Sequence, residues 1–233
     1  MLKLLSKIYA LIGNFSYRKG KTDKAIKWFE KAYRGGKCPP KIGISYGYLQ
    51  LKTGNVEKAD EILTFWRNQR LDQHSQMLAK SNHALVLWKK GHLDEAVALM
   101  EEVHTDFKTT TLYGSLGYLL ILKGDLERAL TFNLEAYEYN DSNAIILDNL
   151  GQTYFLRGEY DKARELYEKM IPTDPAFPEA YYNYGLLLLK ADQPEEALEM
   201  MKKALNYRFS FLSTVKQADI ESKIQEIEAL RGS

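Results

Sequence analysis

The sequence of 233 residues contains only one cysteine, Cys38, so it cannot form an intramolecular disulfide. Nothing in its cysteine usage points to an oxidising compartment. It has only six prolines, and its longest uncharged run, 109–122, is fourteen residues, whereas a membrane span needs about 18 or more. The uncharged run 8–17 continues directly into the repeat described below, so we interpret it as a first helix rather than a leader. We therefore predict no membrane span and a cytoplasmic protein.

The residues that would carry catalysis or bind a metal are also scarce. The four histidines, His74, His83, His92 and His104, show no metal-ligand spacing with one another or with Cys38, so we interpret them as surface or packing residues. Lysines near Cys38 could lower its pKa, but no histidine accompanies it, which disfavours a catalytic thiol. The sequence has no P-loop and no dinucleotide fingerprint. We predict a protein with no catalytic residue, no metal and no cofactor.

Negative charge is scarce in the first part of the chain. Residues 1–52 contain twelve Lys or Arg but only two acidic residues, Asp23 and Glu30. Residues 111–233 show the opposite bias, with thirteen basic and twenty acidic residues. In an elongated molecule such a difference gives one positive and one negative end, which can steer partners or sister copies. The alternative is that both ends are simply solvated.

The most informative feature present is a recurring alanine. Six alanines are separated by 34, 37, 33, 34 and 34 residues: Ala25, Ala59, Ala96, Ala129, Ala163 and Ala197. Each of the first five follows a glycine by five residues, and Asp192 takes the place of that glycine before the sixth. A period in the thirties indicates a repeat array, in which each repeat contacts only its neighbours.

The fifth copy shows most clearly what one repeat contains. Apolar residues recur at steps of three or four over 147–154 and again over 163–170, which predicts two helices. Gly158 lies between them, and glycine favours the conformation in which helices commonly end. Small residues recur on both helices, where the axes must approach to about 8–10 Å. We expect the glycines of the first helices to face the alanines of the second: Gly117, Gly151 and Gly185 with Ala129, Ala163 and Ala197.

This pattern resembles the tetratricopeptide repeat, with its consensus W-x2-L-G-x2-Y, A-x3-F, P. The fifth copy matches it most fully, through Leu147, Leu150, Gly151, Tyr154, Ala163, Tyr167 and Pro175. The resemblance implies an all-α fold, a right-handed α–α superhelix of helix–turn–helix repeats. It predicts a single array over 1–233 with repeats at about 6–39, 40–73, 77–109, 110–143, 144–177 and 178–210.

Some positions depart from the repeat pattern. The third copy has His83 where the others have a bulky apolar residue and Ala84 where they have glycine, and the fourth has Asn133 where an aromatic is usual. Three extra residues lie within 64–76, so we expect longer helices or a longer loop there. Residues 211–231 follow another pattern and predict a capping helix with a polar outer face. Its apolar stripe is Val215, Ala218, Ile220, Ile224, Ile227 and Leu230.

In tetratricopeptide arrays the first helices line a concave groove, and the resemblance implies such a groove here. Two rows of side chains map to it: Asn14, Tyr48, Leu85, Tyr118, Gln152 and Leu186 in one, and Tyr17, Leu51, Trp88, Ile121, Phe155 and Leu189 in the other. Charged residues flank these rows: Lys7, Arg18, Lys41, Lys52, Lys89, Asp148, Glu179 and Lys190. Burial or exposure of Leu51, Ile121 and Leu189 stays open. Large aromatics with a polar edge tolerate water, so we expect partial exposure of Tyr48, Trp88 and Tyr118.

The predicted partner-binding residues are Asn14, Tyr17, Arg18, Tyr48, Lys52, Leu85, Trp88, Lys89, Tyr118, Gln152 and Phe155. Tetratricopeptide domains that hold the acidic C-terminus of chaperones use a clamp of two lysines, two asparagines and an arginine. The corresponding positions here are Ala10, Asn14, Ser45, Leu78 and Asn82, of which only Asn14 matches. We therefore expect no chaperone-tail binding by that clamp.

These observations favour a non-catalytic scaffold that binds a peptide or helix of another protein in its groove. A second hypothesis is a homo-oligomer that assembles through the basic N-terminal end, where apolar residues begin at once without a polar cap. Binding of nucleic acid or of an anionic membrane by that end is a third. We disfavour the third because the basic residues are spread over both helices and loops and the sequence pI is only 7.7.

Overall fold

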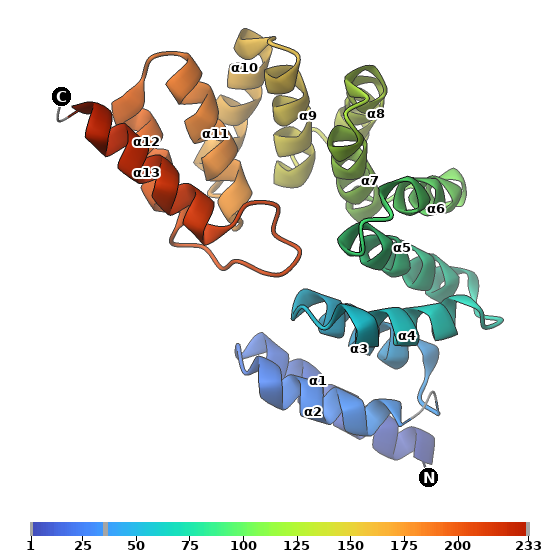
Figure 1. Cartoon of the computed structure of the whole chain (residues 1–233). Coiled ribbons are helices and arrows are strands. Elements are labelled where there is room, and N and C mark those ends of the chain that lie inside the picture. Colours follow the sequence, from blue (N-terminus) through green and yellow to red (C-terminus); the bar gives the residue numbers. More distant parts are fainter. Residues whose placement is uncertain (1, 35–36, 232–233) are drawn as a thin grey trace. The chain divides into compact units, whose positions relative to one another are not determined.

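The computed structural model describes residues 2–34 and 37–231, without the side chains of residues 2, 3, 230 and 231. Within these ranges the chain forms thirteen α-helices and one short 3₁₀-helix, and no strand is found (Figure 1). The helices are α1 (Leu2–Arg18), α2 (Thr22–Tyr33), α3 (Pro40–Lys52), α4 (Val56–Arg67), α5 (Gln73–Lys89), α6 (Leu93–Asp106), α7 (Thr110–Lys123), α8 (Leu126–Tyr139), α9 (Ala144–Leu156), α10 (Tyr160–Met170), η1 (Ile171–Thr173), α11 (Pro178–Lys190), α12 (Pro194–Ala204) and α13 (Gln217–Arg231).

The chain divides into two compact units, Met1–Phe107 (unit 1) and Lys108–Ser233 (unit 2). In unit 1, α1 packs against α2, α3 against α4 and α5 against α6, and consecutive pairs meet through α2 with α3 and α4 with α5. In unit 2 the pairs are α7 with α8, α9 with α10 and α11 with α12. The single array over 1–233 stays a prediction.

The turns between paired helices explain the recurring glycine. Gly158 follows α9 with a φ of +78°, and a Cβ added there would meet no atom within 4 Å. The requirement for glycine is therefore conformational rather than steric. Asp192 occupies the equivalent turn before α12 with a φ of +57°, and aspartate is one of the few other residues that tolerate this region.

The close approach of paired helices is also found, although the facing residue differs from our expectation. A Cβ on Gly151 of α9 would lie 3.0 Å from the Tyr167 ring of α10. The sequence placed Ala163 opposite this glycine, but the contact is made one turn later. Ala163 is fully buried in the core of unit 2, so small size is needed at both positions.

The irregularity expected within 64–76 is confirmed. α4 ends at Arg67, and α5 begins at Gln73 and has 17 residues, compared with 13 in α3. Asp72 caps α5, because its carboxylate accepts a hydrogen bond of 3.0 Å from the Ser75 N–H. The extra residues therefore lengthen the helix and leave a loop at 68–72.

The helix expected near the end of the chain is present as α13, which packs against α12. Ile220, Ile224 and Ile227 are buried in the core of unit 2, together with Val215 from the preceding loop. Ala218 is exposed, so its inclusion in the apolar stripe was wrong. Leu230 lies outside the described side chains, as do Gly232 and Ser233 outside the described residues.

Asn133 is fully buried and replaces the expected aromatic by hydrogen bonding. Its Nδ2 donates to Thr153 Oγ1 at 3.1 Å, and Thr153 Oγ1 donates to the Asn149 carbonyl at 2.7 Å. Asn149 Nδ2 in turn donates to the Gly114 carbonyl at 2.8 Å. This chain of bonds joins α8, α9 and α7. The Asn133 side chain thus links the helices by hydrogen bonds at the position where an aromatic ring was expected to pack.

Candidate functional site

Unit 1 brings together three of the predicted binding residues from two helices. Lys52 of α3 has its Nζ 5.6 Å from the ring centre of Tyr17 on α1 and 5.8 Å from that of Tyr48 on α3. Both distances are within the range of a cation–π interaction. Burial raises the pKa of Tyr48, while Lys52 lowers it and Tyr17 raises it. Tyr17, Tyr48 and Lys52 thus form a half-buried cluster, the Tyr48 cluster.

The other predicted residues of unit 1 are arranged less tightly. Trp88 and Lys89 are neighbours on α5, where Lys89 Nζ lies 3.8 Å from the Trp88 ring centre. Leu85, one turn earlier, is half-buried, whereas Asn14 and Arg18 on α1 are exposed. Leu51, left open by the sequence, is completely buried and unavailable to a partner.

In unit 2 the predicted residues lie on α7 and α9, two first helices that contact each other. Tyr118 on α7 and Gln152 and Phe155 on α9 are half-buried, as is Leu189, whereas Ile121 is buried. Burial raises the pKa of Tyr118 to about 12; a hydrogen bond with the Thr214 side chain lowers it, and Glu179 raises it. The phenol is therefore neutral at physiological pH.

Asp148 of α9 differs from the flanking surface charge that the sequence suggested. Its side chain is only 6% exposed, and its Oδ1 accepts a hydrogen bond of 3.0 Å from Asn183 Nδ2 on α11. Burial raises the pKa of Asp148 to about 7; Glu179 raises it further, while Asn183 and Tyr167 lower it. Asp148 and Glu179, called the acidic pair below, therefore repel each other in an environment with little water.

A segment that sequence reasoning missed lies against this pair. Residues 205–216 connect α12 to α13, and the backbone N–H of Thr214 donates a hydrogen bond of 2.8 Å to Glu179 Oε1. Nearer its start, the Tyr207 hydroxyl donates to Asp174 Oδ1 at 2.8 Å. Val215 is buried in the core. The sequence placed 211–216 in the capping helix, which was wrong, because α13 begins only at Gln217. The contacts of this loop with Glu179 and Asp174 are seen only in the structure.

Comparison with known proteins identifies the repeats. Models described as "TPR repeat" and "Tetratricopeptide repeat" match residues 151–192, 6–34, 178–211 and 77–102. The chain is a tetratricopeptide repeat protein. It is 27% identical over 133 residues to the TPR repeat-containing protein YvcD of Bacillus subtilis, covering 57% of this chain and 28% of that protein. The chain thus spans less than a third of that relative's length.

Solved structures support the fold. A tetratricopeptide repeat protein from Parabacteroides merdae superposes with a TM-score of 0.77 at 16% identity, covering 96% of this chain and 84% of that one. YrrB, described as a TPR protein with an unusual peptide-binding site, has a TM-score of 0.51 at 24% identity, covering 76% and 91%. The all-α, helical-repeat superhelix predicted from the sequence is confirmed.

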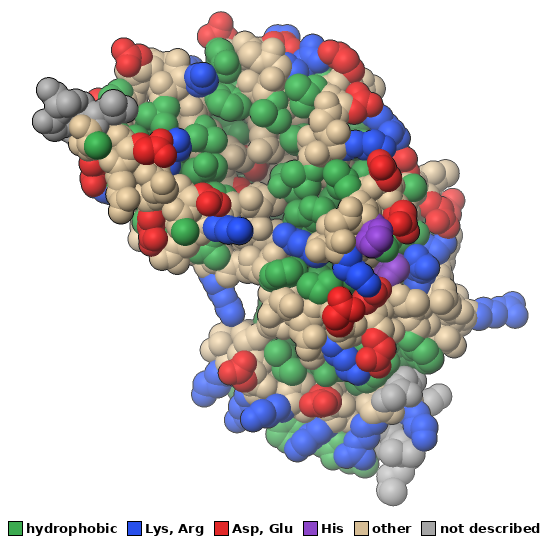
Figure 2. All heavy atoms as spheres, viewed as in Figure 1, with side chains coloured by type: hydrophobic (Ala, Val, Ile, Leu, Met, Phe, Trp, Pro, Cys, Tyr) green, Lys and Arg blue, Asp and Glu red, His purple; other side chains and the backbone are tan. Residues whose placement is uncertain are grey.

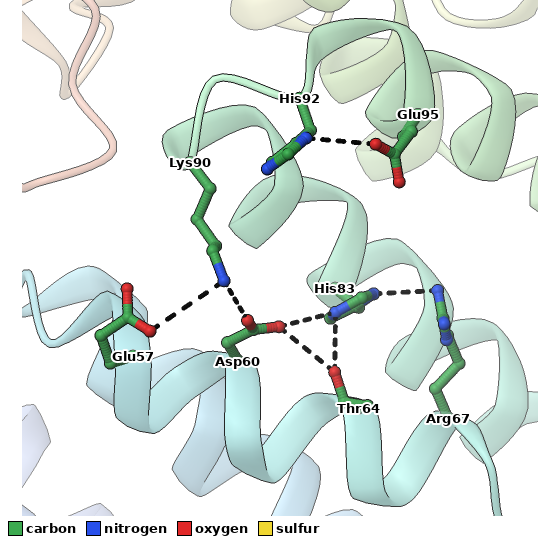
Figure 3. Close-up of polar contacts among 8 residues, drawn as sticks. All are labelled: Glu57, Asp60, Thr64, Arg67, His83, Lys90, His92 and Glu95. Carbon is green, nitrogen blue, oxygen red and sulfur yellow. Dashed lines mark hydrogen bonds and ion pairs between the residues drawn. The ribbon is translucent and has the colours of Figure 1, made fainter.

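His83 lies at the centre of a polar cluster between α4 and α5 (Figure 3). It is buried, and its Nδ1 lies 3.1 Å from Arg67 Nη1, which can only donate, so Nδ1 accepts. Its Nε2 therefore carries the proton and donates to Asp60 Oδ1 at 2.9 Å. Burial lowers the pKa of His83, so the ring is neutral at physiological pH. The cluster, which Lys90 and Thr64 complete, joins two helices and explains the missing apolar residue.

The structure also bears on Cys38, on metal binding and on membrane spans, which the sequence raised. Burial raises the pKa of Cys38 to about 11, so the suggestion that nearby lysines lower it was wrong. In the part of the chain that the structure describes, no group of three or more His, Cys, Asp or Glu side chains is arranged to hold a metal ion. No described helix is long and apolar enough to cross a membrane.

α1 carries an exposed apolar stripe on the face opposite to its packing surface. Leu4, Ile8, Leu11 and Phe15 are 65%, 43%, 67% and 60% exposed. The packing face includes Ser6, whose hydroxyl donates to the Ala32 carbonyl of α2 at 2.8 Å. Lys and Arg side chains predominate around α1 and α2 in the face shown in Figure 2. The stripe is thus an apolar surface in a basic setting, of the kind that marks interaction sites.

Proposed function

We propose that this tetratricopeptide repeat protein is a non-catalytic scaffold that binds a peptide or helix of another protein through its first helices. The observation that carries the proposal is the Tyr48 cluster, in which residues one repeat apart converge around one lysine. Half-buried tyrosine and tryptophan supply large contact area with few rotatable bonds, which is why such residues dominate protein interfaces. The resemblance to YrrB, a protein with a peptide-binding site, is consistent with this role.

The test compares the wild-type protein with a variant carrying Tyr48→Ala, Trp88→Ala and Tyr118→Ala in quantitative affinity capture. We expect the variant to lose most of the captured partner, because truncated interface aromatics typically cost about 2 kcal/mol or more. The control carries Phe65→Ala and Leu134→Ala, which remove exposed apolar side chains from the second helices α4 and α8. Equal recovery of partner by all three proteins would refute binding through the first helices.

The exposed stripe on α1 favours a second candidate function, which is self-association of the chain through its basic N-terminal end. Residues 1–52 are strongly basic and residues 111–233 are acidic, so a head-to-tail contact would have complementary charge. Such a contact would also cover Leu11 and Phe15 of the stripe, whose side chains are 67% and 60% exposed.

Sedimentation at low and high salt tests this candidate, because contacts between charges weaken when the screening length falls below about 8–10 Å. We expect oligomers at low salt that dissociate as salt rises, and a monomer for the variant with Leu11→Ser and Phe15→Ser. The matched control is Leu122→Ser and Leu156→Ser, which changes exposed leucines of unit 2. A wild-type monomer under both conditions would eliminate self-association.

A further inference from the structure

We infer that the first helices of unit 1 bind an extended, acidic segment of the partner protein, with an aspartate or glutamate at every third residue. The inference rests on the proposed scaffold function and adds the chemistry of the bound segment. Among the helices of unit 1, α1, α3 and α5 carry seven lysines or arginines and no acidic residue. The second helices α2, α4 and α6 carry ten acidic residues. The first helices therefore present a positive surface, which complements an acidic partner.

Three of these basic residues occupy the same position in consecutive repeats. Arg18, Lys52 and Lys89, called the cation row below, are the last residues of α1, α3 and α5. They are separated by 34 and 37 residues, the same intervals that separate the first three alanines of the repeat. The next two equivalent positions, on the first helices of unit 2, are Leu122 and Leu156. The cation row is thus a property of unit 1 and not of the repeat in general.

Lys52 is held by aromatic rings rather than by an acidic side chain. Its Nζ lies 5.6 Å and 5.8 Å from the ring centres of Tyr17 and Tyr48, and its side chain is half-buried. Among the described residues, no carboxylate forms an ion pair with Lys52 or Arg18. An ammonium group that is partly withdrawn from water gains from a carboxylate supplied by a ligand. Because the two rings already order the lysine, less conformational freedom is lost when that carboxylate binds.

Polar side chains on the same helix faces favour an extended ligand. They lie four or seven residues before a member of the cation row, so they share its face, and they are exposed or half-buried: Asn14, Ser45 and Asn82. Amide and hydroxyl groups can pair with backbone N–H and C=O groups. An extended segment leaves these backbone groups available, whereas a helix bonds most of them internally.

The distance between neighbouring first helices sets the spacing of the acidic groups. Packed helix axes lie about 8–10 Å apart, and α3 and α5 contact each other. A polyproline II segment rises about 3.1 Å per residue with three residues per turn, so every third side chain returns to the same face after about 9 Å. Carboxylates at every third residue therefore match cations on consecutive first helices.

The test measures binding of three fluorescently labelled, end-blocked peptides to the full-length protein by fluorescence anisotropy. The spaced peptide is Glu-Pro-Ala-Glu-Pro-Ala-Glu. The clustered peptide, Glu-Glu-Glu-Pro-Ala-Pro-Ala, has the same composition, and the third peptide has glutamine in place of each glutamate of the spaced one. The blocked ends exclude recognition of a free terminal carboxylate. We expect the spaced peptide to bind about tenfold tighter than the clustered one, and the glutamine peptide to show no saturable binding.

Variants of the cation row show where the peptide binds. Arg18→Gln and Lys52→Gln should each weaken binding of the spaced peptide about tenfold, the effect of one lost charge-assisted bond. Lys52→Arg, which keeps the charge, should retain most of the affinity. The matched control, Lys24→Gln with Lys27→Gln, removes two exposed charges from α2 of the same unit and should leave the affinity nearly unchanged. Circular dichroism checks that each variant is folded.

Three outcomes would remove the inference. Equal affinity for the spaced and clustered peptides, or an equal loss in the α2 control, would overturn it, because net charge alone would then explain binding. Binding to vesicles that contain phosphatidylserine but to none of the peptides would also overturn it and would assign the cation row to a membrane surface. Partner capture that depends on Tyr48 and Trp88 but is unaffected by Arg18→Gln and Lys52→Gln would leave the proposed function standing and remove only this addition.

Discussion

At the scale of single residues, Asp148 combines two properties that rarely coexist without a function or a cost. It is nearly inaccessible to water, and its neighbour Glu179 has the same charge. The folded protein therefore favours the protonated form of Asp148, with a pKa of about 7, whereas an unfolded chain gives aspartate a pKa of about 3.9. A raised pKa in the folded state means that stability is lost as pH rises from about 4 to about 7.

Asp148→Asn should remove this part of the pH dependence, because asparagine keeps an acceptor for Asn183 and cannot ionise. We expect the variant to match the wild type near pH 4 and to be more stable at pH 8, by on the order of 4 kcal/mol. Urea denaturation at both values measures the difference. Asp161→Asn, at an exposed position of α10, is the control. A wild-type pH profile in Asp148→Asn would contradict the raised pKa.

Ala163 shows how the size of a single side chain limits packing. Its side chain has no exposed surface and lies in the core of unit 2. Leucine there would force neighbours away from their preferred rotamers, and overpacking of this kind costs about 1–3 kcal/mol. We expect a lower melting temperature for Ala163→Leu than for Glu165→Leu, which places leucine on the exposed face of the same helix. Equal melting temperatures would show that the alanine is not a close-contact position.

At this scale the sequence identified where small residues are needed but not always what they touch. The alanine spacing predicted burial correctly at Ala163, because a helix period fixes which face points inward. It did not reveal that Asp148 is buried, since an acidic residue on a first helix is usually solvated. Nor did it predict the hydrogen bonds of His83 or Asn133, because their partners lie 16 to 23 residues away in the sequence.

At the scale of the secondary-structure element, α13 illustrates how a helix outside the repeat can complete a core. Its periodicity was enough to predict a helix with one buried face, and Ile220, Ile224 and Ile227 form that face. The loop before it was not predictable, because Thr214 and Tyr207 are held by the side chains of Glu179 and Asp174, more than thirty residues away, rather than by local pattern. Length and turn composition alone say nothing about such long-range contacts.

Ile220→Ala should therefore destabilise unit 2 strongly. The side chain is fully buried, and truncation of a buried isoleucine to alanine costs about 2–5 kcal/mol, because a cavity remains. Ala218→Ser, on the exposed face of α13, should have almost no effect. Chemical denaturation followed by circular dichroism compares the two. If Ile220→Ala and Ala218→Ser have the same midpoint, α13 does not contribute to the core of unit 2.

At the scale of the whole molecule, the repeat period predicted the fold class well because it is redundant. Six alanines and five glycines at related spacings tolerate individual departures such as His83 or Asp192. The period does not identify the binding residues in the same way, since a groove position is defined by its place in a repeat and not by its chemistry. Tyr17, Tyr48 and Lys52 converge as expected, whereas the acidic pair and the segment over it emerge only from the folded chain.

The single array predicted from the sequence is tested by cutting the chain between Phe107 and Lys108, the boundary of the two compact units. Unit 2 has its own extended core from α9 to α13, so we expect the fragment 108–233 to be helical and to unfold cooperatively. In a repeat array each repeat is stabilised by its neighbours. The backbone amides of unit 2 should therefore exchange their hydrogens more slowly in the full chain than in the fragment. Equal protection in both would indicate two independent units, and an unfolded fragment would contradict the self-sufficient core.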